Sequence, residues 1–260
     1  MKILIFRKNK IFIAFVIIIL IFIICNLFFK STAKIKNSPI QSLNYICESN
    51  EKIAYLTFDD GPTSKMTPKI LDILKSEDIK ATFFVVGKQV ANNPDIVKRA
   101  YDEGHFIANH GFSHNNKLLY KNSESFIAEI LNTDKEISKA IGIDDYHSHV
   151  FRFPNGFSAP IYKSRKEKVI TKLSAIHYFY VDWNCLNKDS EKKYSNFQLL
   201  QNLKNSTKNK GTLIILMHDT GDVNNTNEVL KDSIDYLKSE GYQFKNFYEL
   251  ISPTHATFKN

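Results

Sequence analysis

The chain has 260 residues, 43% of them apolar, which is ordinary for a globular protein with one large α/β domain. Its formal net charge is +8, but seven of the 35 basic residues and none of the 27 acidic ones lie in residues 1–36. The remaining 28 basic and 27 acidic residues make the main part nearly neutral, so we expect no nucleic-acid partner. Three cysteines are too few for a disulfide framework or a thiolate zinc site.

The N-terminal segment is strongly apolar. Residues 11–29 are apolar apart from Asn26, and three basic residues lie within residues 7–10. About 20 such residues, each rising ~1.5 Å, cross a bilayer core, so this segment is predicted to be a transmembrane anchor. The basic residues predict that residues 1–10 are a cytoplasmic tail and that the rest is exported, as in a single-pass cell-membrane protein. A cleaved signal peptide is the alternative, but the apolar run is long and no small-residue cleavage site closes it.

The next segment, residues 30–48, is polar and without clear periodicity, which is typical of a linker, so the folded domain is expected at residues 49–260. Its first strand is predicted over residues 53–56, because β-branched and aromatic residues precede a Gly-Pro stop. After it, short apolar strands alternate with amphipathic helices. The expected strands cover residues 81–86, 105–109, 150–153, 177–181 and 212–217, and the expected helices 67–77, 94–103, 123–141, 161–173, 196–204 and 227–239. Six or seven such repeats predict an α/β fold with a parallel, closed or nearly closed (β/α) barrel.

Polar residues follow several of these strands. In a (β/α) barrel the chemistry gathers at the C-terminal ends of the strands, so we expect such residues to meet at one rim. In chain order they are Asp59, Asp60, His110, His114, Arg152, Asp189 and His218.

Two adjacent carboxylates, Asp59 and Asp60, are costly at the mouth of a strand, because desolvation and mutual repulsion would push one of them toward its neutral form. His110 and His114 are four residues apart, a spacing that brings two imidazoles together on a helical turn or a tight loop. With Asp60 they form a three-ligand set that leaves positions open for water, as in catalytic zinc sites. The plainer alternatives are a solvated Asp-Asp turn and two surface histidines.

Four segments in fixed order carry a resemblance: Thr57-Phe-Asp-Asp-Gly61, His110-Gly-Phe-Ser-His114, Arg152-Phe-Pro-Asn-Gly156 and Leu216-Met-His218-Asp219. They resemble the successive motifs of the polysaccharide deacetylase family, also called the NodB homology or carbohydrate esterase family 4 domain. The resemblance covers roughly residues 50 to 252. It implies a distorted (β/α)₇ barrel that removes N-acetyl, sometimes O-acetyl, groups from polysaccharides such as peptidoglycan or chitin with the help of a metal.

The resemblance also implies a role for each matching residue. Asp59 would be the general base that takes a proton from a metal-activated water, and Arg152 would orient Asp59. His218 would be the general acid for the leaving amine, and a backbone N–H near Asn155 would stabilise the oxyanion. The metal would most often be Zn²⁺, with Co²⁺ or another divalent ion as alternatives. The implied ligands are Asp60, His110 and His114.

One motif departs from the family pattern. Before the final motif the family has Asp-x-x-Asp-Trp, and here Leu186 and Ser190 stand in place of the first Asp and of the Trp. Asp189 matches the second Asp and is expected to tune His218.

The missing Trp ordinarily helps to wall the substrate groove, so its loss bears on substrate preference. Trp183 is close enough in sequence to fill that space, and the alternative is that it is a core aromatic. Leu216 is expected to be buried in its strand, and in the family the equivalent Leu lines the acetyl pocket.

Three classes of function follow from these observations. The first is a membrane-anchored, metal-dependent N-deacetylase acting on N-acetylglucosamine of peptidoglycan, because a tether holds an enzyme beside its polymer. The second is an O-acetyl esterase, or a deacetylase of chitin-like or exported polysaccharide. The third is a catalytically inactive glycan-binding relic, which is disfavoured because every expected catalytic position is filled.

Overall fold

The computed structural model describes residues 42–220 and 226–251. The expected cytoplasmic tail, the expected anchor at residues 11–29 and most of the expected linker lie outside these described residues. No helix within the described ranges combines the length and the hydrophobicity that a bilayer span requires.

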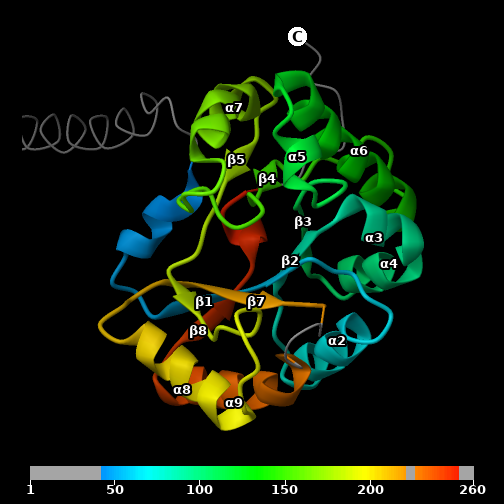
Figure 1. The fold of residues 1–260 in the computed structure, drawn as a ribbon. Coiled ribbons are helices and arrows are strands. Elements are labelled where there is room, and N and C mark those ends of the chain that lie inside the picture. The colour runs from blue at the N-terminus through cyan, green and yellow to red at the C-terminus, as the bar shows by residue number, and fades with distance from the viewer. Residues whose placement is uncertain (1–41, 221–225, 252–260) are drawn as a thin grey trace, which may run out of the picture. The chain divides into compact units, whose positions relative to one another are not determined.

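The described strands form one parallel sheet with the order β5-β4-β3-β2-β1-β7-β6, and β8 pairs with the first half of β1. The strands are β1 (Ile53–Asp59), β2 (Thr82–Val85), β3 (Phe106–Asn109), β4 (Val150–Phe151), β5 (Phe179–Tyr180), β6 (Cys185–Leu186), β7 (Leu213–His218) and β8 (Gln243–Lys245). The sheet curls inside a ring of helices (Figure 1), but no pairing among the described strands joins β5 to β6. The predicted α/β class with a distorted barrel is therefore confirmed. Of the two alternatives, closed or nearly closed, the described sheet is not closed but forms an open half-barrel.

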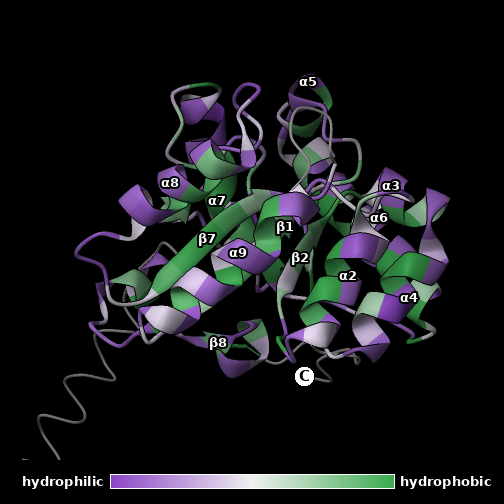
Figure 2. Cartoon of the chain, turned by 90° about the horizontal axis from the view of Figure 1, so that it is seen from below, coloured by the Kyte–Doolittle hydropathy of each residue, from purple (hydrophilic) through white to green (hydrophobic). Residues whose placement is uncertain are grey.

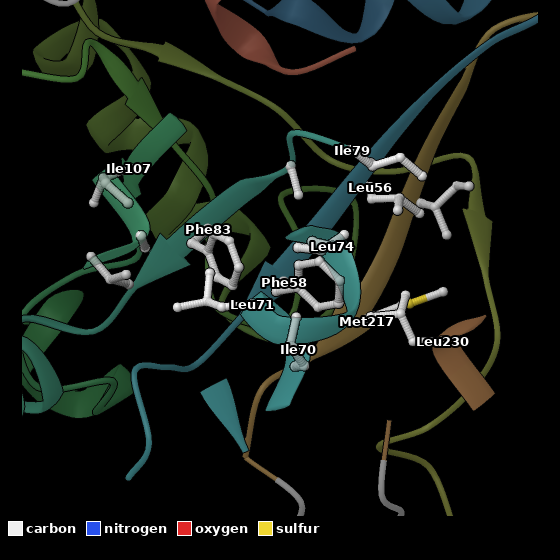
Figure 3. Packing of buried hydrophobic residues seen from close by; sticks show 14 of the residues in the cluster. Leu56, Phe58, Ile70, Leu71, Leu74, Ile79, Phe83, Ile107, Met217 and Leu230 are labelled. Atoms are coloured by element: carbon white, nitrogen blue, oxygen red, sulfur yellow. The ribbon is translucent and has the colours of Figure 1, made fainter. Parts of the chain in front are cut away.

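The strand β1 shows how the curled sheet sorts its side chains. Leu56 and Phe58 point outward into the cluster beneath the helices, whereas Tyr55 and Asp59 belong to the opposite, inner face. Figure 3 shows Leu56 and Phe58 among the apolar side chains of the neighbouring strands and of helix α2. Fully burying such a side chain stabilises the fold by about 1.5–3 kcal/mol. The alternation directs Asp59 inward.

The helices cover the outer face of the sheet, with their apolar sides toward the strands and their polar sides outward (Figure 2). They are α2 (Thr67–Ser76), α3 (Gly87–Asn92), α4 (Pro94–Asp102), α5 (Asn116–Leu119), α6 (Ser123–Ile141), α7 (Lys163–Ala175), α8 (Asn196–Thr207) and α9 (Thr226–Ser239). The longest, α6, begins at an Asn122 cap and ends at Gly142, whose φ of 73° suits glycine.

Two short 3-10 helices complete the half-barrel. In η2 (Phe247–Glu249), the Phe247 ring lies inside the sheet, with its centroid 5.6 Å from that of Tyr55. The other, η1 (Leu43–Glu48), buries Leu43 against the same interior and occupies the opening beside β5 (blue in Figure 1). It therefore covers the side on which the sheet is open.

Several elements differ from the sequence-based expectation. The helix η1 lies in the segment expected to be a linker, and α3, α5, β6 and β8 were not expected. The strands β4 and β5 have only two residues each, shorter than predicted. Pieces this short bury too few side chains to leave a periodic signal, because their position depends on tertiary packing.

Candidate metal centre

The C-terminal ends of β1, β3, β4 and β7 meet at one rim. Asp59 pairs with His218 across β1 and β7, and Asn109 pairs with Phe151 across β3 and β4. His110 and Arg152 directly follow that second pair. Parallel strands therefore deliver a carboxylate, two imidazoles and a guanidinium to the same edge.

Asp60, His110 and His114 converge at this rim. Asp60 Oδ1 lies 3.3 Å from His110 Nε2 and 3.1 Å from His114 Nε2. One ligand atom from each residue lies within 4.8 Å of the other two, which gives a group that could hold a metal ion. His110 is buried, whereas the His114 side chain is 39% exposed, so the group opens to solvent on one side.

The hydrogen bonds of these residues fit a bound cation. His110 Nδ1 lies 2.8 Å from the Arg152 carbonyl, which can only accept, so Nδ1 carries the proton and Nε2 presents a lone pair. Asp60 Oδ1 is buried, and no described residue donates a well-aligned hydrogen bond to it. The Asp60 oxygen and the His110 lone pair therefore lie close to His114 Nε2, in an arrangement that could hold a divalent ion.

The charge of Asp60 is also favoured. Burial acts to raise the pKa of this carboxyl, but the adjacent His110 and His114 imidazoles outweigh burial and hold the pKa well below its usual range. Asp60 is thus an anion, which is the form in which a carboxyl group binds a metal.

Asp59 is held by Arg152. The Asp59 side chain is 4% exposed, and its Oδ1 accepts a 2.8 Å hydrogen bond from Arg152 Nη1. The other oxygen, Oδ2, lies 3.8 Å from His110 Nε2. One oxygen of Asp59 is therefore engaged and the other faces the ligand group.

His218, at the end of β7 and next to Asp59 on β1, is held by Asp189. Its Nδ1 lies 2.7 Å from Asp189 Oδ1, and its backbone N–H donates to Asp189 Oδ2 at 2.8 Å. Burial acts to lower the pKa of His218, but the hydrogen bond and charge of Asp189, together with the charges of Asp59 and Asp60, raise it to about 9. The imidazole therefore carries a proton on Nδ1 and, at neutral pH, a second on Nε2.

Comparison with known proteins agrees with this geometry. A family model described as Polysaccharide deacetylase matches residues 47–174. The putative polysaccharide deacetylase YheN of Bacillus subtilis is 34% identical over 235 residues, which cover 87% of this chain and 79% of YheN. The chain belongs to the polysaccharide deacetylase family.

Two further members of the family are informative. The peptidoglycan-N-acetylmuramic acid deacetylase PdaA of Bacillus subtilis is 34% identical, with 83% of this chain and 78% of PdaA covered. The catalytic domain of a peptidoglycan N-acetylglucosamine deacetylase from Eubacterium rectale superposes with a TM-score of 0.70 at 27% identity. That match covers 80% of this chain and 94% of the other.

The predicted substrate-binding residues of this family member lie around the rim. Asn155 is exposed and has a φ of 64°, and Leu216 is buried on β7 beside Thr57 of β1. Trp183 is half-buried, packs against the interior cluster and lines a cavity of about 460 Å³ that Asn155 also lines. The packing of Trp183 agrees with a core aromatic, and its role as a wall of the substrate groove stays a prediction.

Asp182 is a carboxylate that sequence reasoning missed. Its Oδ1 accepts from the Phe157 N–H at 2.7 Å, and its Oδ2 accepts from the Ser158 N–H at 3.1 Å. These bonds hold the loop that contains Asn155. Asp182 lies just after β5. Its position after a predicted strand was the signal that could have assigned it to the rim.

Glu129 was missed as well. It lies on α6, is only 9% exposed and accepts hydrogen bonds from the Phe112 and Ser113 N–H groups, between the two imidazoles. An acidic residue on the apolar face of an amphipathic helix, one position before Ile130, was the signal that could have found it.

Proposed function

We propose that this protein is a metal-dependent N-deacetylase that removes acetyl groups from N-acetylglucosamine residues of peptidoglycan. The observation that carries this proposal is the convergence of Asp60, His110 and His114 between an Arg152-held Asp59 and an Asp189-held His218. Glycan binding without catalysis would not require a carboxylate and an imidazole held in fixed orientations by Arg152 and Asp189.

The ligand group would hold a divalent ion, with zinc favoured by two imidazoles and one carboxylate. When bound, that ion supplies Lewis-acid activation of water and of the acetyl carbonyl.

Asp59 is proposed as the general base. Arg152 engages Oδ1 and stabilises the carboxylate, so Oδ2 is the oxygen available to take a proton from the attacking water. Asp59 is the last residue of β1, so its carboxylate lies at the rim, where a water molecule beside the ligand group can approach it.

His218 is proposed as the general acid. An amine is a poor leaving group unless its nitrogen is protonated as the C–N bond breaks. With Nδ1 bound to Asp189, only Nε2 can donate that proton. Asp189 fixes the orientation of the His218 ring. Its hydrogen bond and its charge raise the pKa of His218 and so favour the charged imidazolium.

The substrate assignment is supported by the relatives and by the N-terminal segment. PdaA and the Eubacterium rectale enzyme are both named for peptidoglycan, one for its muramic acid and one for its glucosamine. We propose that residues 11–29 anchor the chain in the cell membrane, with the folded domain on the cell-wall side, where a tether keeps it beside this polymer.

The deciding experiment measures acetate released by the purified full-length chain from peptidoglycan, chitooligosaccharide and acetylated xylan, each with and without a chelator. We expect release from peptidoglycan, loss of release with chelator, and a fall of about 10²–10⁴-fold in Asp59→Asn. Mass spectrometry of the digested glycan assigns the lost acetyl group to glucosamine or muramic acid.

Other outcomes have definite meanings. Release from acetylated xylan alone would establish the O-acetyl esterase instead, and release from chitooligosaccharide alone a chitin-type deacetylase. Equal release by wild type and Asp59→Asn would remove the proposed base. For the anchor, deletion of residues 11–29 should move the chain from the membrane fraction to the soluble fraction.

A further inference from the structure

The backbone between the two imidazoles is held from two directions. On one side, the N–H groups of Gly87 and Lys88 at the start of α3 donate to the carbonyls of Gly111 and Phe112, both at 3.0 Å. These bonds hold the carbonyl oxygens of the segment. They leave its N–H groups to be satisfied by other partners.

On the other side, side chains accept the N–H groups. Asn109 Oδ1 accepts from Gly111 at 2.9 Å. A single oxygen, Glu129 Oε2, accepts from both Phe112 at 2.9 Å and Ser113 at 2.7 Å. The three consecutive N–H groups between the imidazoles are thus all bound by side chains.

This segment needs such support because its conformation is not locally favoured. Gly111 has a φ of 84° and His114 a φ of 51°, so the loop turns through the left-handed region twice. Outside glycine that region costs about 1–3 kcal/mol per residue and persists only when the surroundings hold it. A loop relaxed from this conformation would carry His114 Nε2 away from Asp60 Oδ1.

We propose that Glu129 is a positioning residue that sets the metal affinity of the site by fixing the separation of His110 and His114. This inference rests on the proposed function, because it assumes that the ligand group binds a metal. Glu129 itself is not one of the converging ligands of the described residues. Its Oε2 is engaged by two N–H groups, so it acts on the metal through the loop.

Two variants of Glu129 separate the reach of the side chain from its charge. Glu129→Gln keeps an acceptor oxygen at the same reach and removes the charge. Glu129→Asp keeps the charge but is one methylene shorter, so it withdraws the carboxylate from both N–H groups. Glu124→Gln is the matched control, because Glu124 is exposed on the same helix and loses the same charge.

The experiment titrates Co²⁺ into the purified full-length chain and follows the visible absorption, which reports affinity and coordination geometry without any turnover. We expect Glu129→Asp to weaken Co²⁺ binding about 10–100-fold and to change the spectrum, as loss of an outer partner does elsewhere. Glu129→Gln should stay within about fivefold of wild type, because a neutral acceptor still accepts both bonds. The control should match wild type.

The results that overturn the proposal are equally definite. Unchanged Co²⁺ affinity and spectrum in Glu129→Asp would show that the loop holds its shape without this carboxylate. A larger loss of Co²⁺ affinity in Glu129→Gln than in Glu129→Asp would show that the charge of Glu129, not its position, is what matters. Failure of the proposed metal site gives a different result. Wild type and Asp60→Ala would then bind Co²⁺ equally, because the ligand group would not be where Co²⁺ binds.

Discussion

Arg152 Nη1 donates a 2.8 Å hydrogen bond to Asp59 Oδ1, and both side chains are almost wholly buried. The same guanidinium donates to Thr57 Oγ1 and to the carbonyls of Val181 and Asp182. One side chain therefore joins β1 to the segment after β5, close to where the sheet is open.

Replacing this guanidinium should cost stability as well as activity. In Arg152→Met, Asp59 would be left as an uncompensated buried charge, and breaking a buried pair in this way costs about 3–5 kcal/mol. Urea unfolding monitored by circular dichroism measures the loss. Arg99→Met is the control, since Arg99 pairs with Asp72 at the surface and should lose no more than about 1 kcal/mol. Equal losses of unfolding free energy in the two variants would show that the buried Arg152–Asp59 pair contributes no more to stability than a surface pair.

A metal that binds the folded chain should raise its thermal stability. Zn²⁺ at 100 times its dissociation constant stabilises the fold by about 2.7 kcal/mol if the unfolded chain does not bind it. Differential scanning calorimetry with and without Zn²⁺ should show a higher Tm for wild type and no shift for His110→Ala. A shift of equal size in that variant would place the bound ion elsewhere.

The pH dependence of stability should report on His218. Its pKa is raised to about 9 in the folded chain, against about 6.5 when unfolded. A raised pKa means that the folded state holds the extra proton, so this contribution is full below about 6.5 and is lost as the pH rises through about 9.

The measurement is the free energy of unfolding between pH 6 and pH 10, in chelator, for wild type and His218→Gln. The advantage of wild type should shrink across this range, and Asp189→Asn should remove most of the slope because it removes the main partner. A difference that is constant with pH would show that His218 does not titrate between the two states.

How far the sequence predicts this structure depends on how local each signal is. Asp59 ends a strand that is marked by a continuous apolar run and is buried on both faces, so its place at the rim and its pairing with His218 follow from the motif order and the parallel topology. The opening between β5 and β6 depends on two-residue strands that only tertiary contacts define. Glu129 supports its loop through contacts between distant segments, which periodicity does not reveal.

Trp183 should matter for long substrates more than for chemistry. Its half-buried ring lines the cavity beside Asn155, where it can offer an apolar face to a sugar. In Trp183→Ala we expect kcat/KM for polymeric glycan to fall about 10-fold through KM, with kcat nearly unchanged, as for loss of uniform binding. Steady-state kinetics on polymer and on a short acetylated oligomer provide the comparison. A fall in kcat alone would instead assign the ring to support of Arg152, which lies 5.7 Å from it.

Gly61 should tolerate no side chain, because the carboxyl of Asp219 fills the space beside it. A Cβ at Gly61 would lie 2.0 Å from Asp219 Oδ2. That carboxyl is fixed in place: Oδ1 accepts from Thr67 Oγ1 at 2.6 Å, and the Asp219 N–H donates to the Asp59 carbonyl at 2.9 Å. Gly61→Ala should therefore destabilise the chain by about 1–3 kcal/mol, as overpacking does. In a double-mutant cycle, Asp219→Ala should relieve much of that cost, because it removes the atoms that the new methyl meets. Strict additivity of the two changes in urea unfolding would show that the clash is not what excludes a side chain here.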